Sequence, residues 1–319
     1  MTNDDGSVIF KPALPAEVNF YQSVLSNPEL EPLRPYIPRF YGTLRLEGQA
    51  DQEQSIDGII ALKPGSAEAI SDDEKDSIVL ENLSCTFSKP NVLDIKLGTI
   101  LYDESASEEK RARMEKTARE TTSLETGVRL TGFSVYDLAK NAPVVAPKSY
   151  GKSIKAAQLP EGVARFFPVA HSTSQLLQVP SNSAAGTGLP PDVLLPILES
   201  LRDDISEIRE ALSNAQLRMV GASLLVVYEA DVERAREGVK FWLSEDGEVD
   251  EDEGDEGDEG DEDEGEGSKK PGIPYNVKLI DFAHTRLVPG QGPDEGVLLG
   301  LSTVLRLLDG RMEVVKALL

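Results

Sequence analysis

The chain has 319 residues, 39% of them hydrophobic, and a formal net charge of −24. A chain of this length forms one large or two modest domains around a buried core. Its acidic composition excludes the overall basic surface of a nucleic-acid-binding protein, and its single cysteine excludes a disulfide framework. No apolar run is long enough to predict a membrane span, and the first ten residues lack the pattern of a signal peptide. We therefore expect a soluble protein of the cell interior.

The first eighty or so residues predict a small antiparallel sheet with one helix. Four segments rich in β-branched and aromatic residues are typical of strands: 7–13, 40–47, 59–62 and 77–83. Residues 16–25 have helical spacing, with four residues near one face: Val18, Tyr21, Gln22 and Leu25.

After Gly98 longer helices are expected. Helix-forming composition or spacing marks four segments: 104–120, with Ser107 as the N-cap, 160–168, 192–217 and 294–319, the last as one or two helices. Apolar runs predict three strands: 128–137, 222–230 and 276–284. Residues 139–157 contain proline, glycine and lysine and predict a loop.

One strongly acidic segment interrupts the second half of the chain. Residues 245–266 hold sixteen Asp and Glu and no base, and subtracting them from −24 leaves −8 for the rest. A stretch that repels itself and buries nothing does not fold, so we expect residues 244–268 to be a disordered excursion between two strands. A docking site for a basic partner and weak binding of divalent cations are the alternatives.

The chemistry-bearing residues are few. The sequence lacks the motifs GxxxxGK[ST], GxGxxG, GxSxG and HExxH, and its two histidines are too few for a His-rich metal centre. Lys11 lies in the first predicted strand, Asp94 and Lys96 share one face of an extended segment, and Asp281 ends another strand. Such groups serve phosphoryl transfer, where lysines neutralise phosphates and an aspartate holds Mg²⁺. Each is also ordinary alone, as an exposed lysine, a surface ion pair or a strand-end cap.

The segment PNVLDIKLG resembles the PxxxDxKxG signature of the inositol polyphosphate kinase family, with Pro90, Asp94, Lys96 and Gly98 at its fixed positions. Other segments resemble the family in the same order: KPALPAEVNFYQ, YGKSI, GVARFF, ASLLVVYE with Ala222 in place of a serine, IDFAHT and DEGVLLGL. Within the family the chain is most similar to the multikinases, in particular fungal ones, because the segment after Gly98 is short.

The resemblance implies a two-lobed, protein-kinase-like α+β fold. A small antiparallel-sheet N-lobe, residues 1–82, would bind the nucleotide. A larger α/β C-lobe, residues 83–319, would carry a short helical insertion at 103–168 that binds inositol phosphates. The HRD loop of protein kinases is absent, and residues 281–283, Asp-Phe-Ala, take the place of their DFG.

The resemblance also implies a nucleotide site. Lys11, backed by Glu17, would contact the phosphates of ATP. Glu81 and Leu83 would form the hinge that binds adenine through backbone groups, and Asp94 would hold the ribose hydroxyls.

For the reaction itself, Lys96 would bridge the transferred phosphate and the attacking hydroxyl, and Asp281 would coordinate Mg²⁺. His284 would approach the substrate, although a lone histidine at a strand end is often only a structural hydrogen-bonder. Asp94 and His284 are both candidates for a general base.

The substrate is a polyanion, and screening limits each surface charge to about 8–10 Å, so local charge decides binding. Lys110, Arg113 and Lys116 would form a basic face on the predicted helix 104–120, extended by Lys152 and Arg165. The alternative is an ordinary exposed helix, because four glutamates alternate with these bases.

We therefore expect an ATP- and Mg²⁺-dependent kinase that phosphorylates inositol tris- and tetrakisphosphates on ring hydroxyls. A kinase of phosphoinositide lipids, or one that forms inositol pyrophosphates, is the alternative among enzymes. A third possibility is a scaffold whose residues 245–266 bind a basic transcription-regulatory protein, since fungal members of the family are associated with nuclear transcription control. On the same ground we expect a nuclear and cytoplasmic protein.

Overall fold

The structure is a computed structural model that describes residues 2–3, 5–44, 50–51, 61–62, 77–170, 188–244 and 272–319. Its first elements are β1 (Val8–Pro12), α1 (Pro15–Ser26), the 3-10 helix η1 (Pro28–Tyr36), β2 (Phe40–Leu44), β3 (Ala50–Asp51), β4 (Ala61–Leu62) and β5 (Ser77–Glu81). The others are β6 (Pro90–Leu97), α2 (Glu108–Glu120), α3 (Ser123–Thr126), β7 (Val128–Asp137), β8 (Ala142–Ala146), α4 (Lys148–Ser153), η2 (Ala156–Gln158), α5 (Leu159–Phe166), α7 (Pro191–Asn214), β9 (Leu217–Met219), β10 (Ser223–Glu229), α8 (Val232–Trp242), β11 (Tyr275–Ile280), β12 (Thr285–Leu287) and α9 (Glu295–Lys316).

A three-stranded antiparallel sheet in the order β1-β5-β2 forms the N-terminal part and contains the predicted strands 7–13, 77–83 and 40–47. The fourth predicted strand, 59–62, is not in it: its described residues, Ala61–Leu62, pair with β3 instead.

Helix α1 covers the three-stranded sheet, and its buried face is partly the predicted one: Tyr21 is buried as predicted, but Phe20 and Val24 are buried with it, whereas Leu25 is 59% exposed. The reason is tertiary. Phe20 stacks on Phe282, which follows β11, with the ring centroids 4.3 Å apart, so contact with a distant segment selects the face.

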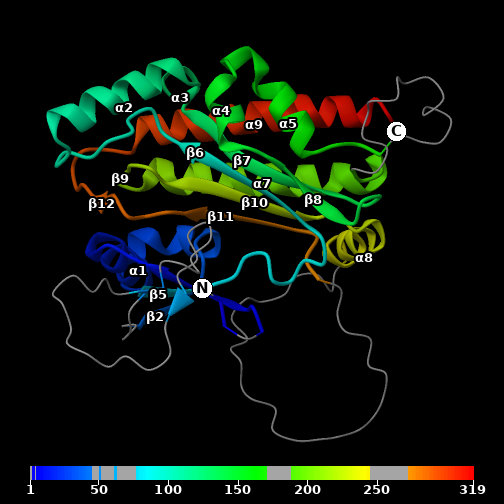
Figure 1. Cartoon of the computed structure of the whole chain (residues 1–319), viewed down its shortest axis with the longest axis horizontal. Coiled ribbons are helices and arrows are strands. Elements are labelled where there is room, and N and C mark those ends of the chain that lie inside the picture. The colour runs from blue at the N-terminus through cyan, green and yellow to red at the C-terminus, as the bar shows by residue number, and fades with distance from the viewer. Residues whose placement is uncertain are drawn as a thin grey trace, which may run out of the picture.

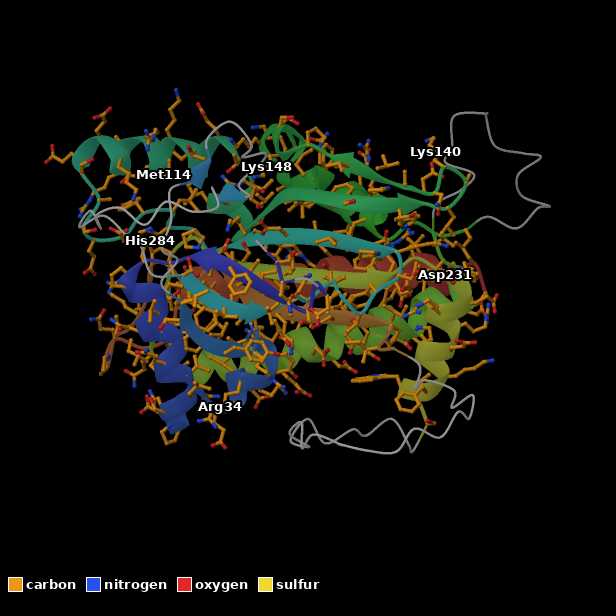
Figure 2. All side chains as sticks on the ribbon, turned by 60° about the horizontal axis from the view of Figure 1, so that its bottom comes forward. Arg34, Met114, Lys140, Lys148, Asp231 and His284 are labelled. Atoms are coloured by element: carbon orange, nitrogen blue, oxygen red, sulfur yellow. The ribbon has the colours of Figure 1, made fainter. Side chains whose placement is uncertain are left out.

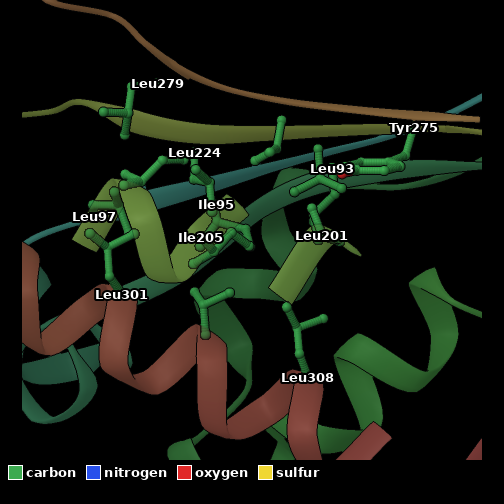
Figure 3. Packing of buried hydrophobic residues seen from close by; sticks show 14 of the residues in the cluster. Leu93, Ile95, Leu97, Leu201, Ile205, Leu224, Tyr275, Leu279, Leu301 and Leu308 are labelled. Atoms are coloured by element: carbon green, nitrogen blue, oxygen red, sulfur yellow. The ribbon is translucent and has the colours of Figure 1, made fainter. Parts of the chain in front are cut away.

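A five-stranded sheet in the order β11-β10-β6-β7-β8 forms the larger part, and every neighbouring pair is antiparallel. Helices α7 and α9 pack on one of its faces (Figure 1). Figure 3 shows leucines of both helices packed under the strands, where Leu93, Ile95 and Leu97 of β6 point into the core. Because side chains alternate along a strand, Asp94 and Lys96 lie on the opposite face.

The predicted strands 128–137, 222–230 and 276–284 and the predicted helices are confirmed, and the C-terminal segment is one helix. The loop predicted over 139–157 is wrong, because this segment forms β8, the edge of the large sheet, and α4. Residues 103–168 therefore supply two strands of the sheet as well as helices. Helix α8 was not predicted.

Strands β10 and β11, on either side of the acidic segment, are antiparallel neighbours, as an excursion between two strands requires. Residues 245–271, which hold the acidic segment, lie outside the described residues, as does the predicted loop 64–76. Residues 82–89 connect the two sheets, and the predicted boundary at 82 falls at the start of this connection. In the described part of the chain, no helix has the length and apolar character to cross a bilayer.

Candidate functional site

Lys96 and Asp281 meet in space although they are 185 positions apart in sequence. Lys96 Nζ lies 2.6 Å from Asp281 Oδ2 and donates a second hydrogen bond, of 2.9 Å, to the carbonyl of Gly221. The sheet creates this meeting because Ser223 of β10 is paired with Lys96 on one side and with Ile280, the residue before Asp281, on the other. Lys96 and Asp281, to which the resemblance gives roles at the same phosphate, thus meet in the structure.

The backbone of Asp281 has a left-handed conformation, with φ of 66°. Aspartate and asparagine adopt it more readily than other residues with a side chain. It ends β11 at Ile280 and precedes Phe282, which is fully buried. Packing of the phenylalanine thus anchors the chain directly beside the carboxylate.

Lys11 of β1 completes the cluster. Its Nζ lies 2.9 Å from Asp281 Oδ1 and 2.8 Å from Glu17 Oε1, and the Glu17 side chain on α1 is 1% exposed. Each oxygen of Asp281 therefore accepts a hydrogen bond from a different lysine. The N-terminal sheet, α1 and the large sheet each contribute a side chain, so the cluster lies between the two parts of the fold. We call Lys11, Glu17, Lys96 and Asp281 the ion cluster.

Electrostatics keep Asp281 and Lys11 charged. Burial opposes ionisation of Asp281, but the positive charges of Lys96 and Lys11 outweigh burial and lower the pKa of its carboxyl. Burial also disfavours the ammonium form of Lys11, yet Asp281 and Glu17 raise the pKa of that amine. At neutral pH Asp281 and Lys11 are therefore both ionised. A charged ammonium can donate to a phosphate oxygen in place of a carboxylate oxygen.

Asp94 lies on the same face of β6 as Lys96 and is half-buried. Burial raises the pKa of its carboxyl, against the opposing charge of Lys96. Its Oδ1 atom is buried and makes no hydrogen bond of normal geometry with the described residues, while the hydroxyl of Ser223 acts on the carboxyl group and lowers its pKa. A buried carboxylate oxygen without a donor fits a ligand that brings hydroxyl groups.

Two cations near Asp94 were not singled out from the sequence. Arg129 of β7 is paired with Lys96 in the register of β6 and β7, and Lys148 at the start of α4 acts on Asp94 through its charge. Burial lowers the pKa of the Arg129 guanidinium, and the charge of Asp94 opposes this. The sequence does predict both strands, but not their register, which decides that Arg129 lies beside Lys96.

The predicted hinge residues lie at the junction of the two sheets. Glu81 is the last residue of β5, and its backbone N–H donates to the carbonyl of Arg39 at 3.1 Å. Leu83 follows in a turn that begins the connection to β6. Both side chains are half-buried.

His284 lies between α2 and α1 (Figure 2). Together with Lys11, Glu17 and Asp281 it lines an open pocket of about 390 Å³. Its Nδ1 atom lies 2.8 Å from Asp103 Oδ2, a residue that precedes α2. No local sequence signal indicates this contact, because it depends on how the segment before α2 folds against the segment after β11.

Helix α2 carries the predicted basic face, and its N-cap is the predicted Ser107, which accepts a hydrogen bond from the N–H of Lys110. Lys110 is half-buried and therefore turned toward the protein, whereas Arg113 is exposed. Lys116 has a side chain that is 70% exposed and points to solvent, 3.8 Å from Glu120. The structure thus brings Lys110 nearest to the body of the protein.

Lys152 and Arg165 lie on α4 and α5. Lys152 is exposed, and Arg165 pairs with Glu161 at 2.5 Å and lies over the ring of Tyr150. In Figure 1 helices α2, α3, α4 and α5 line the same side of the large sheet. A hydrogen bond from Lys155 to the carbonyl of Glu120 ties the end of α2 to the segment after α4.

A divalent cation would find few ligands in the protein itself. Within the described residues, no three His, Cys, Asp or Glu side chains are grouped to hold a metal ion. Mg²⁺ in phosphate-transfer sites takes one or two carboxylates and completes its octahedron with substrate phosphates and water. The hard, ionised carboxylate of Asp281 fits a cation that arrives with a nucleotide.

Comparisons with known proteins agree with this geometry. The family model described as inositol polyphosphate kinase matches residues 77–309. An inositol polyphosphate multikinase of Saccharomyces cerevisiae is 33% identical, over 96% of this chain and 93% of its own length. The human inositol hexakisphosphate kinase 3 is 28% identical over 74% of this chain and 51% of its own length.

A solved structure is also similar. The crystal structure of an inositol phosphate multikinase of S. cerevisiae, in complex with ADP and Mn²⁺, matches with a TM-score of 0.66 and 25% identity. The match covers 96% of this chain and all of that chain. The chain therefore belongs to the inositol polyphosphate kinase family.

Proposed function

We propose that this protein is an ATP-dependent inositol polyphosphate multikinase, which transfers a phosphoryl group to ring hydroxyls of inositol tris- and tetrakisphosphates. The observation that carries the proposal is the ion cluster: Lys11 and Lys96, from distant segments, both bind Asp281, and Lys11 and Asp281 line one pocket. The similarity to a yeast multikinase along 96% of the chain supports the multikinase branch of the family.

In this proposal the protein acts by positioning and charge neutralisation, which supply most of the barrier reduction in phosphoryl transfer. Lys11, held by the buried Glu17, binds the phosphates of ATP. Lys96 lies between the transferred phosphate and the attacking hydroxyl. Asp281 would hold Mg²⁺, which would supply further neutralisation of the phosphate charge. No covalent enzyme intermediate is required.

The same proposal places the nucleoside of ATP on one side of the ion cluster and the inositol phosphate on the other. On the side of the N-terminal sheet, Glu81 and Leu83 bind adenine, and the orphaned oxygen of Asp94 accepts a ribose hydroxyl. On the other side, helices α2, α4 and α5 present cations to the acceptor phosphates: Lys110, Arg113, Lys116, Lys152 and Arg165.

The test is incubation of the purified protein with ATP, Mg²⁺ and separate inositol phosphate isomers, with products resolved by ring position. We expect tris- and tetrakisphosphates to gain phosphates. Inositol hexakisphosphate and phosphoinositides in vesicles, run in parallel, test the pyrophosphate-forming and lipid alternatives. Absence of transfer to every soluble tris- and tetrakisphosphate would overturn the proposal.

We also propose that residues 245–266 bind a basic partner, such as a transcription-regulatory protein, and that the protein is nuclear as well as cytoplasmic. The sixteen acidic residues of this segment, with no base among them, support an electrostatic contact. Deletion of 245–266 should leave kcat within twofold and abolish salt-sensitive binding to a basic protein. Loss of activity would instead assign the segment to the enzyme.

A further inference from the structure

Asp103 and His284 form a pair next to the ion cluster. His284 Nδ1 lies 2.8 Å from Asp103 Oδ2, and the side chains of Asp103 and His284 are 14% and 39% exposed. An ionised carboxylate oxygen carries no hydrogen and would repel a bare ring lone pair at 2.8 Å, so the contact favours the tautomer with the hydrogen on Nδ1. In the neutral ring Nε2 then keeps an unshared electron pair.

Neighbouring contacts fix Asp103. Its Oδ1 accepts a hydrogen bond of 2.6 Å from the hydroxyl of Ser105, and its carbonyl accepts one of 3.1 Å from the N–H of Ala106. The hydrogen bond from Ser105 lowers the pKa of the Asp103 carboxyl, and His284 lowers it further when its ring is protonated. The carboxylate is thus kept ionised and held in one place.

The next residue forms a separate ion pair of the same kind. Glu104 pairs with Arg286 of β12, two residues beyond His284. Asp103 and Glu104 therefore clamp the segment 99–107 to the segment 284–286. Of the two side chains held in this way, His284 and Arg286, His284 lines the pocket that Lys11 and Asp281 also line, and Arg286 does not.

We propose that Asp103 is a positioning residue that holds His284 as its Nδ1–H tautomer, so that Nε2 accepts the proton of the attacking ring hydroxyl. The inference rests on the proposed function for the identity of the acceptor. As the hydroxyl oxygen bonds to the γ-phosphorus of ATP, the bond from that phosphorus to the β,γ-bridging oxygen breaks and ADP leaves. The hydroxyl proton passes to Nε2, and the imidazolium, paired with Asp103, later releases it to water.

Asp103→Asn is the informative substitution because Ser105 orients the side chain. If the amide carbonyl stays on the hydroxyl of Ser105, the amide NH₂ takes the place of Oδ2 and faces His284 Nδ1. A donor at that place requires Nδ1 to accept and moves the hydrogen to Nε2. Nε2 can then no longer take a proton.

The first measurement is nitrogen NMR of the imidazoles, which reports the tautomer directly and needs no activity. The chain has two histidines, so the His171→Gln variant assigns the spectrum. We expect the wild type and the Glu104→Gln control to show the Nδ1–H tautomer at His284, and Asp103→Asn to show the Nε2–H tautomer. Unchanged tautomers in Asp103→Asn and in Asp103→Ala would overturn the inference.

The second measurement separates kcat from KM. General-base assistance is worth about 10²-fold or more in many enzymes and less for a loose phosphoryl-transfer transition state, so we expect Asp103→Asn to lower kcat about tenfold. The KM values for ATP and for the inositol phosphate should stay within twofold, and Glu104→Gln should keep kcat within twofold. A raised KM with unchanged kcat would overturn the inference. A wild type that is inactive on inositol phosphates, with the expected tautomers, would instead contradict the proposed function.

Discussion

The ion cluster and the basic face of α2 both carry lysines, but in different surroundings. In the cluster, Lys96 is 21% exposed and its amine lies 2.6 Å from a carboxylate. On α2, Lys116 is 70% exposed and 3.8 Å from its nearest acid. Exposed ion pairs contribute about 0–1 kcal/mol, whereas partly buried charges interact more strongly because less water screens them.

The difference shows how a chain with a net charge of −24 suits phosphate chemistry. The cluster fixes a few charges at defined positions, as a reaction needs. The basic face of α2 gathers several charges at loosely defined positions, as capture of a polyanion needs. The net charge of the chain affects neither, because exposed charges farther away than about 8–10 Å are screened.

The largest effect is expected in the cluster. Asp281→Asn keeps the shape of the side chain and tolerates the positive φ, and Lys96→Met keeps most of the volume, so both remove charge without a packing defect. We expect either change to lower kcat by about 10³-fold or more, since transition-state charge loses its partner. Steady-state kinetics measures the loss, and thermal unfolding should show a folded protein.

A matched pair at the other end of β6 provides the control. Lys89 precedes β6, and its Nζ lies 2.8 Å from Asp231, with both side chains 26% exposed. Lys89→Met breaks a lysine–aspartate pair of similar geometry away from the pocket, and kcat should stay within twofold. If Lys89→Met were as harmful as Lys96→Met, the special place of the ion cluster would be refuted.

A smaller effect is expected on α2. Charge reversal at Lys110 and Arg113 should raise the KM for the inositol phosphate about tenfold and leave the KM for ATP unchanged, because the helix lies away from the predicted hinge. The KM for inositol phosphate should also become less sensitive to salt. Arg119→Glu is the control, since this exposed arginine pairs with Glu115 on the same helix. An unchanged KM in the double variant, or an equal rise in the control, would remove the basic face from the site.

Much of the fold follows from sequence periodicity. The apolar spacing of α7 and the alternation in β7 are local properties, and the structure reproduces both elements. The loop predicted over residues 139–157 is wrong because the prolines and the glycine of this segment fit a strand and a helix once the chain is folded. Pro143 is tolerated on the edge strand β8, and Gly151 packs on the carbonyl of Leu130, where a Cβ atom would lie 1.5 Å from that oxygen.

The candidate site was predictable to the extent that it depends on motifs. Asp94 and Lys96 share a face because strand periodicity is two, whatever the rest of the chain does. Their meeting with Asp281 needed the resemblance, because no spacing rule links residues across 185 positions. The sequence did not predict that Asp103 and Arg129 contact or lie beside site residues. Strand register and the docking of loop segments depend on the packed core and not on local sequence.

A third comparison, between two half-buried carboxylates, gives the smallest expected effect. Asp204 on α7 accepts a hydrogen bond of 2.8 Å from Tyr275 of β11, but no amine of the described residues forms an ion pair with it as Lys96 and Lys11 do with Asp281. Burial raises the pKa of Asp204 from 3.8 to about 6. The folded state therefore binds more protons than the unfolded state between these values, and its stability falls as the pH rises from about 4 to 6 and stays lowered above.

Asp204→Asn removes this penalty while its carbonyl can still accept from Tyr275. The shift corresponds to about 3 kcal/mol at most, and partial exposure of the side chain reduces this to about 1–2 kcal/mol of added stability at pH 7.5 and none near pH 4. Urea unfolding at both pH values measures it. The control is Asp203→Asn, because that side chain is 73% exposed and should show no pH-dependent gain. An equal gain at both pH values would mean that ionisation of Asp204 does not destabilise the fold. A half-buried aspartate would then not need lysine partners, as Asp281 has, to remain ionised at little cost.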